Sequence, residues 1–152
     1  MRRFLVVVDD SPESRLAVRF AAGRAAHVGG GRLVLFHVIP PTDFEHWVAV
    51  ADRMREEALD EAEDLVGRIA DELKAEWGIT PEIVVREGQP REMLRDYVQE
   101  CPHLFALILG ANSGNDPGPL VEYFSGPVAG SLPCPVVIVP GGMTAEQIDA
   151  IV

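Results

Sequence analysis

The chain has 152 residues, of which 47% are hydrophobic and 24% charged, and its 24 acidic and 13 basic residues give a formal net charge of −11. A chain of this length buries about 70% of the surface that its unfolded form exposes, so residues 1–152 can fold as one soluble domain without disulfides or a metal. The composition excludes disordered and collagen-like chains. The longest apolar runs, residues 4–8 and 104–109, are far shorter than the roughly 20 residues that span a bilayer.

The net charge and the cysteines indicate which partners and which cellular compartment to expect. Binding to a phosphate backbone needs clustered basic residues, and this acidic chain has a single lysine, Lys74. Cys101 and Cys134 are far apart and form no CxxC pair, which is typical of reduced thiols. The apolar run before Asp9 is short and has no small-residue cleavage site after it, so we do not expect a signal peptide. We therefore expect a cytoplasmic protein with neither a nucleic acid nor a membrane as its partner.

Five β-like runs alternate with helix-like stretches, a pattern that predicts an α/β fold with a parallel sheet. The first run, residues 4–8, is continuously apolar, as expected of a strand buried on both faces. Ser11 is placed to cap a helix that begins at Pro12, and three glycines at 29–31 end it. The second strand is predicted over residues 32–38, and residues 42–50 are predicted to form a loop or an irregular helix start.

A long amphipathic helix is predicted over residues 52–75, where apolar residues recur every three or four positions. Ten acidic residues lie between Asp52 and Glu76. We interpret this acidic face as a solvated surface that favours solubility, and a partner-binding surface is the alternative.

The second half of the chain completes the alternation. A third strand is predicted over residues 81–86, a third helix begins at Pro90, and a fourth strand covers residues 104–109. Residues 110–142 carry seven of the 14 glycines, which predicts a long loop and a short, interrupted helix. The fifth strand, residues 136–139, precedes a terminal helix that opens with a capping box from Thr144 to Gln147.

Ligands of open parallel sheets bind beyond the carboxyl ends of the strands, so the residues that follow each strand are the candidates for a site. The acidic pair Asp9 and Asp10 is similar to the magnesium-binding pair of a receiver domain. A receiver also needs an acceptor Asp after its third strand and a Lys after its fifth. Residues 86–88 are Arg-Glu-Gly and the single lysine lies in the acidic helix, which disfavours this interpretation.

Four short motifs, in the same order and at matching spacing, indicate another family. They are Val8-Asp9-Asp10-Ser11 with Ser14, His37-Val38, Gly88-Gln89-Pro90, and Pro135-Val136. Over residues 4–139 this pattern resembles the universal stress protein family. The resemblance implies a Rossmann-like fold of the adenine-nucleotide alpha hydrolase type, an open five-stranded parallel sheet of order 3-2-1-4-5 with helices on both faces. It also implies a role in stress response and a homodimer.

Many members of that family bind ATP, so ATP or AMP, with magnesium, is the ligand that the resemblance implies. The binding residues that it implies here are Asp9, Ser11, Val38, Gly88, Gly110, Asn112, Gly114, Ser125 and Gly126. The family's Gly-x2-Gly-x9-Gly-Ser/Thr motif is altered. Gly114 comes one residue late, and counting nine on from it gives Phe124-Ser125 where Gly-Ser is expected. Counted back from the end of the motif instead, Pro127 replaces the hydroxyl residue after Gly126.

Several roles remain open for these residues. Asp9 and Val38 preserve the nucleoside half of the implied pocket, whereas the altered loop weakens the case for phosphate binding. The glycines are equally explained by turn geometry, Ser11 by helix capping, and Asp9 by the favourable position of an acid at a helix N-terminus. The first hypothesis is a non-enzymatic nucleotide-binding domain, and the second is a protein-interaction module with a degenerate pocket. Weak ATP hydrolysis ranks last, because no general base or phosphate-clamping Lys is evident.

Neither catalytic residues nor metal ligands are predicted. The four histidines lack metal spacing, and His37, inside a strand, is expected to be a hydrogen-bonded core residue. An apolar strand at the sheet edge needs a cover, which pairing with a second copy supplies. The residues of this expected dimer contact are Val136, Val137, Ile138 and Val139. Under the second hypothesis, the acidic helix or the terminal helix would be the contact surface for another protein.

Overall fold

The computed structural model describes residues 2–41 and 48–152, and within them five parallel strands form one sheet of order β3-β2-β1-β4-β5. This confirms the predicted fold. In chain order the elements are β1 (Arg3–Val7), α1 (Pro12–His27), β2 (Arg32–Ile39), α2 (Val48–Trp77), β3 (Glu82–Glu87), α3 (Pro90–Glu100), β4 (Leu104–Ala111), α4 (Pro119–Ser125), a 3-10 turn (Ala129–Ser131), β5 (Val136–Pro140) and α5 (Ala145–Ile151).

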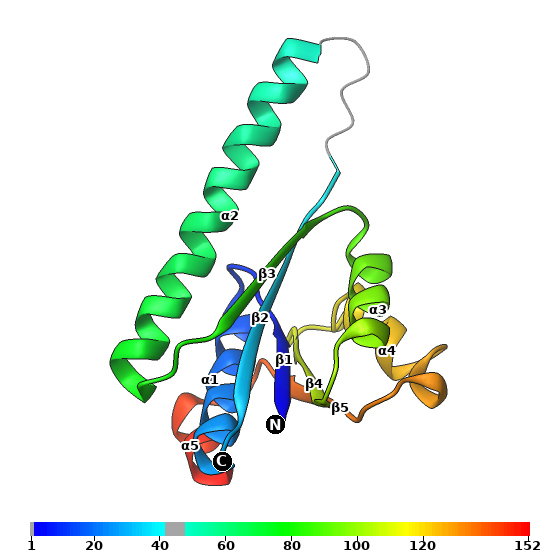
Figure 1. Cartoon of the computed structure of the whole chain (residues 1–152). Coiled ribbons are helices and arrows are strands. Elements are labelled where there is room, and N and C mark those ends of the chain that lie inside the picture. Colours follow the sequence, from blue (N-terminus) through cyan, green and yellow to red (C-terminus); the bar gives the residue numbers. More distant parts are fainter. Residues whose placement is uncertain (1, 42–47) are drawn as a thin grey trace.

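Helices cover both faces of the sheet, as Figure 1 shows. One core cluster packs α1, α2 and α5 against the sheet, and the other packs α3 and α4 against the opposite face. β1 lies at the centre of the sheet. Its consecutive residues Leu5 and Val6 belong to different core clusters, and both are fully buried. The continuous apolar run therefore serves two cores at once.

Element boundaries differ from the prediction by a few residues. β3 begins at Glu82 rather than residue 81, because Pro81 has no N–H group for the ladder. β4 continues to Ala111, where it pairs with Pro140. α2 begins at Val48 instead of residue 52, since Val50 and Met54 extend its apolar spacing towards the N-terminus. The rest of the expected loop, residues 42–47, lies outside the described residues. No helix among the described residues is long and apolar enough to cross a membrane.

The predicted helix caps are confirmed. The Ser11 hydroxyl accepts a hydrogen bond from the Ser14 amide at 3.2 Å, with Pro12 at the first helical position. At α5 the Thr144 hydroxyl accepts from the Gln147 amide at 3.1 Å, and the Gln147 side chain accepts from the Thr144 amide at 2.9 Å. These bonds satisfy N–H groups that the first turn of a helix otherwise leaves unpaired.

α5 folds back onto α1. Ile148 is fully buried, and the Arg19 guanidinium donates to both carboxylate oxygens of Asp149 at 2.6 and 2.7 Å. These hydrogen bonds lower the pKa of Asp149. Arg19 also contacts Glu76 at the end of α2 at 3.1 Å. Val152 packs over Gly23, where an added Cβ would come within 2.5 Å of a Val152 methyl group. The C-terminal segment is thus held against α1 by the Arg19–Asp149 ion pair and by the close packing of Val152 on Gly23.

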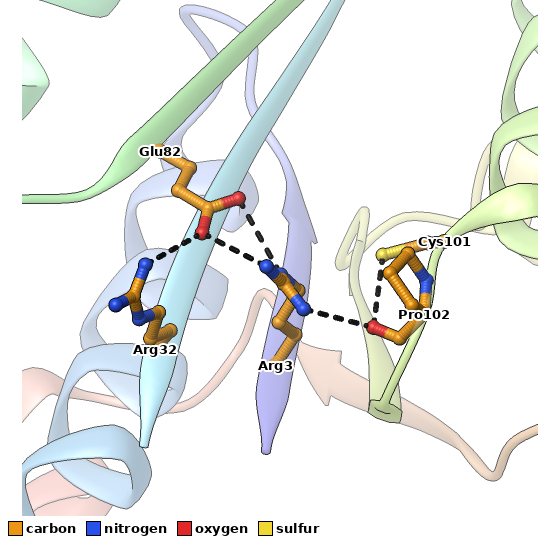
Figure 2. Close-up of polar contacts among 5 residues, drawn as sticks. All are labelled: Arg3, Arg32, Glu82, Cys101 and Pro102. Carbon is orange, nitrogen blue, oxygen red and sulfur yellow. Dashed lines mark hydrogen bonds and ion pairs between the residues drawn. The ribbon is translucent and has the colours of Figure 1, made fainter. Parts of the chain in front are cut away.

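A polar cluster joins β1, β2 and β3 to the turn before β4 (Figure 2). The Glu82 carboxylate contacts Arg3 at 3.5 Å and Arg32 at 3.3 Å, and Arg3 donates to the Pro102 carbonyl at 3.1 Å. The Arg3 side chain is only 19% exposed, so solvent screens these contacts less than it screens ordinary surface pairs. One arginine therefore links three separate parts of the chain.

Replacing Arg3 with Ala is expected to lower the free energy of unfolding by about 1 kcal/mol, because a partly buried carboxylate and a carbonyl both lose a donor. Urea unfolding followed by circular dichroism measures this change. Arg53→Ala is the matched control, since Arg53 is exposed and forms no ion pair with the residues that the structure describes. Equal midpoints for the two variants would show that the cluster contributes nothing to stability.

Candidate functional site

A cavity of about 310 Å³ lies at the carboxyl ends of β1, β2 and β4. It is lined by four of the predicted site residues, Asp9, Ser11, Val38 and Gly110. The other walls come from His37, from Pro90 at the start of α3, and from residues 117–121. Its volume is near the lower end of the range of about 300 to 1,000 Å³ that is typical of ligand pockets.

The turn between β1 and α1 positions Asp9. The Asp9 amide donates to the buried Ser14 hydroxyl at 2.9 Å, and Asp9 Oδ1 accepts from the Ser11 amide at 2.8 Å. The other carboxylate oxygen, Oδ2, accepts no hydrogen bond from the residues that the structure describes. Ser11 and Ser14 thus hold the backbone of the turn, while the second carboxylate oxygen of Asp9 has no donor among the described residues.

His37 joins the ends of β1 and β2. Its Nδ1 lies 2.7 Å from the Val8 carbonyl, which can only accept, so the ring donates this hydrogen bond. The structure therefore gives His37 the hydrogen-bonded role that its place in a strand predicts. The adjacent Val38 is 9% exposed and offers an apolar surface to the cavity.

Gly110 allows α1 to lie close to β4. A Cβ at this position would lie 2.3 Å from the Glu13 carbonyl oxygen and 2.6 Å from its carbon, both backbone atoms of the first turn of α1. Such distances are forbidden, so only glycine fits without movement of the helix. Packing alone accounts for this glycine, although its backbone also lines the cavity.

The loop after β4 hydrogen-bonds to itself. Asn112 Oδ1 accepts from the Gly114 amide at 2.8 Å, and Asp116 Oδ1 accepts from the Gly118 amide at 3.0 Å. Asn112 Nδ2 also donates to the Glu13 carboxylate at 3.4 Å. Amides of this kind cradle phosphate in glycine-rich loops. Here the amides of Gly114 and Gly118 already donate hydrogen bonds to side-chain oxygens of the same loop.

The remaining predicted residues lie away from the cavity. The Ser125 hydroxyl donates to the Val121 carbonyl of its own helix at 2.6 Å, and Gly126 sits against the Glu122 carbonyl. Gly88 adopts φ 152° beside Met93. Five of the nine predicted residues are therefore not brought to the cavity, namely Gly88, Asn112, Gly114, Ser125 and Gly126. After Gly126 only the short 3-10 turn Ala129–Ser131 forms.

Residues 117–121 also line the cavity, although none of them is among the nine predicted binding residues. Gly118, with φ 109°, turns the chain into α4, which places Leu120 and Val121 against the cavity. The signal available in the sequence was Pro117-Gly118-Pro119, a break and a helix start, followed directly by two apolar residues.

The charge of the cavity is acidic. Among its described lining residues Asp9 and Glu13 are carboxylates, and none is Lys or Arg. A polyphosphate placed here would meet like charge and would find no cation to neutralise it. The arrangement therefore suits an uncharged or weakly charged polar molecule.

The thiols and the other candidate ligands offer no further chemistry at this site. Cys101 and Cys134 are free and partly buried, and burial raises the pKa of the Cys134 thiol. Burial, together with a hydrogen bond to Cys101, raises the pKa of Tyr97 to about 12. In the described ranges, no three His, Cys, Asp or Glu side chains come together as metal ligands would.

A family model described as the universal stress protein family matches residues 1–140. The chain belongs to the universal stress protein family. Among similar solved structures, universal stress protein UspA from Lactobacillus plantarum is 18% identical with a TM-score of 0.70, and the match covers 91% of this chain and 97% of that one. No curated protein sequence matches the chain.

Two other similar structures were solved with nucleotides. The family member from Arabidopsis thaliana with AMP bound is 16% identical, with a TM-score of 0.66 and coverage of 97% of this chain and 95% of that one. The universal stress protein from Archaeoglobus fulgidus in complex with dAMP is 19% identical, with a TM-score of 0.61 and coverage of 91% and 98%. At these identities the likeness shows the shared fold.

Replacing Gly110 with Ala is expected to destabilise the protein by roughly 1–3 kcal/mol, because the new methyl group forces the first turn of α1 away from β4. The free energy of unfolding in urea measures the effect. Gly130→Ala is the control, since nothing lies within 4 Å of a Cβ added there, and it should change stability by less than about 0.5 kcal/mol. A Gly110→Ala variant as stable as Gly130→Ala would contradict the packing role of Gly110.

Proposed function

We propose that this universal stress protein is a non-enzymatic regulatory domain, formed by residues 1–152, that binds the nucleoside part of an adenine nucleotide in the 310 Å³ cavity. Adenosine and AMP are the proposed ligands, in preference to ATP with magnesium, and the proposed setting is a cytoplasmic stress response. The observation that carries this proposal is the contrast between the two sides of the site. Asp9 and Val38 line the cavity, whereas the loop after β4 hydrogen-bonds its own amides.

The nucleoside side has suitable chemistry. Val38, Leu109 and Leu120 provide apolar surface for a base, and Asp9 Oδ2 is available to accept hydrogen bonds from ribose hydroxyls. An acidic residue beyond a strand end performs that task in other dinucleotide-binding sheets. Relatives solved with AMP and dAMP support an adenine nucleotide as the ligand class.

The phosphate side disfavours a long polyphosphate. The Gly118 amide already donates a hydrogen bond to Asp116, and the Ser125 hydroxyl donates to the Val121 carbonyl of its own helix. A triphosphate would therefore approach carboxylates without gaining the donors that a phosphate-binding loop supplies. A single phosphate at the open mouth of the cavity meets less of this repulsion. ATP hydrolysis ranks last for the same reasons.

Calorimetric titration with adenosine, AMP and ATP, with and without magnesium, tests the proposal. Adenosine and AMP are expected to bind, and ATP to bind at least about tenfold more weakly. Asp9→Asn should weaken adenosine binding about tenfold, because it removes a charged acceptor. Its amide oxygen can still accept from the Ser11 amide, which preserves the turn.

Asp10→Asn is the matched control, since Asp10 is adjacent to Asp9 but does not line the cavity. It should leave the adenosine affinity unchanged. Magnesium–ATP binding as tight as AMP binding would show that the loop holds phosphate after all. No binding at millimolar adenosine and AMP would refute the proposal and favour an interaction module with a degenerate pocket.

The open edge of β5 supports a homodimer. Among the described strands β5 pairs only with β4, and its Ile138 is 38% exposed. An unpaired apolar edge is prone to associate. We propose that two copies pair along β5 through Val136, Val137, Ile138 and Val139.

Replacing Ile138 with Lys is expected to convert the dimer into a monomer, because two lysines would face one another across the two-fold axis. Sizing chromatography with light scattering measures the mass. Ile83→Lys is the control on the opposite edge of the sheet, where β3 also exposes a large apolar side chain, 49% exposed. A dimer that survives Ile138→Lys but not Ile83→Lys would place the interface on β3 instead.

A further inference from the structure

A second cavity, of about 460 Å³, opens between α1, α2 and the segment that follows β5. It shares no lining residue with the cavity that contains Asp9 and Val38. Its volume is again within the range of ligand pockets.

The inner surface of this second cavity is apolar. Leu16 from α1, Leu73 from α2 and Met143 line it, and all three pack in or against the same core cluster. Trp77, the last residue of α2, adds a half-buried indole ring. Methionine adapts readily to the shape of a bound molecule, and an aromatic ring offers it a large apolar surface. The cavity can therefore receive the apolar body of a small ligand.

One wall is made by residues beyond the family's matched region. The family model ends at residue 140, and Gly141, Met143 and Ala145 line the cavity. The position of this wall is fixed by the buried Ile148 and by the Arg19–Asp149 ion pair. The segment after β5 is thus held rigidly enough to shape a site.

The charges around the cavity favour a cation. Arg15 and Arg19 line it, but Asp10 pairs with Arg15 at 3.0 Å, and Asp149 and Glu76 pair with Arg19. Glu72 also lines it and forms no ion pair with the residues that the structure describes. Counted with their partners, the two arginines stand against four carboxylates, namely Asp10, Glu72, Glu76 and Asp149, so the local balance is negative. The face of an indole ring also attracts organic ammonium groups.

We propose that this cavity binds an organic cation with an apolar body, such as an aromatic or alkyl ammonium compound. The apolar body lies against Leu16, Leu73 and Met143, and the ammonium group lies near Glu72 and Trp77. This site is separate from the nucleoside site, so each can be present without the other.

Titration of the ¹⁵N-labelled protein with benzyltrimethylammonium, followed by NMR chemical shifts, tests the proposal. Saturable shifts are expected for amides of α1, the end of α2 and residues 141–145. Benzenesulfonate, a similarly sized anion, is expected to produce none at equal concentration. Binding of the anion in place of the cation would overturn the assigned charge preference.

Glu72→Gln should weaken benzyltrimethylammonium binding about fivefold, because it removes the unpaired carboxylate. Glu57→Gln is the matched control, an exposed glutamate of the same helix that does not line the cavity, and should leave the affinity unchanged. Met143→Trp, which fills the cavity, should abolish binding, while adenosine titration shows that the variant remains folded.

Equal weakening by Glu72→Gln and Glu57→Gln would show general attraction to an acidic helix and would refute a specific site. Shifts confined to the N-terminal half of α2, or no saturable shifts at all, would also refute it. If adenosine does not bind the parent protein, circular dichroism takes its place as the folding control, so the two proposals fail separately.

Discussion

The close approach of α1 to the end of β4 is the constraint on which the rest of the site depends. At Gly110 the backbone of β4 lies so near the Glu13 carbonyl that no side chain fits between them. This contact sets where α1 begins, and the Ser11 and Ser14 hydrogen bonds then fix the turn that carries Asp9. The cavity exists because strand ends and helix start are held at this spacing. A small backbone feature thereby determines the geometry of a polar site.

Local signals in the sequence predict the strands and most of the helix boundaries, whereas the sheet order 3-2-1-4-5 follows from the family resemblance. Apolar runs such as residues 4–8 specify buried strands, and Ser11 and Thr144 carry capping side chains that need only their own next turn. The closeness of Asp9 and Val38 follows from the strands themselves, since the ends of neighbouring parallel strands must meet at one edge. Asp9 and Val38 accordingly line one cavity.

The loop after β4 and the C-terminal segment could not be predicted in the same way. Asn112 and Asp116 accept hydrogen bonds from amides of their own loop. These bonds depend on backbone angles that a glycine- and proline-rich sequence does not specify. The position of α5 depends on Arg19 meeting Asp149 across 130 residues of chain. Neither segment carries a sequence pattern that indicates such a pairing. The second cavity, which this pairing completes, was therefore visible only in three dimensions.

The packing of α5 against α1 also has a consequence for the order of folding during synthesis. Arg19 of α1 is synthesised 130 residues before its partner Asp149, and Ile148 and Val152 complete the cover on the same face of α1. The sheet and the helices up to residue 140 can assemble while that face is still open to solvent. The contact of α5 with α1 can form only after that stage. Until then the backbone at Gly23, over which Val152 packs in the folded protein, lies open to solvent.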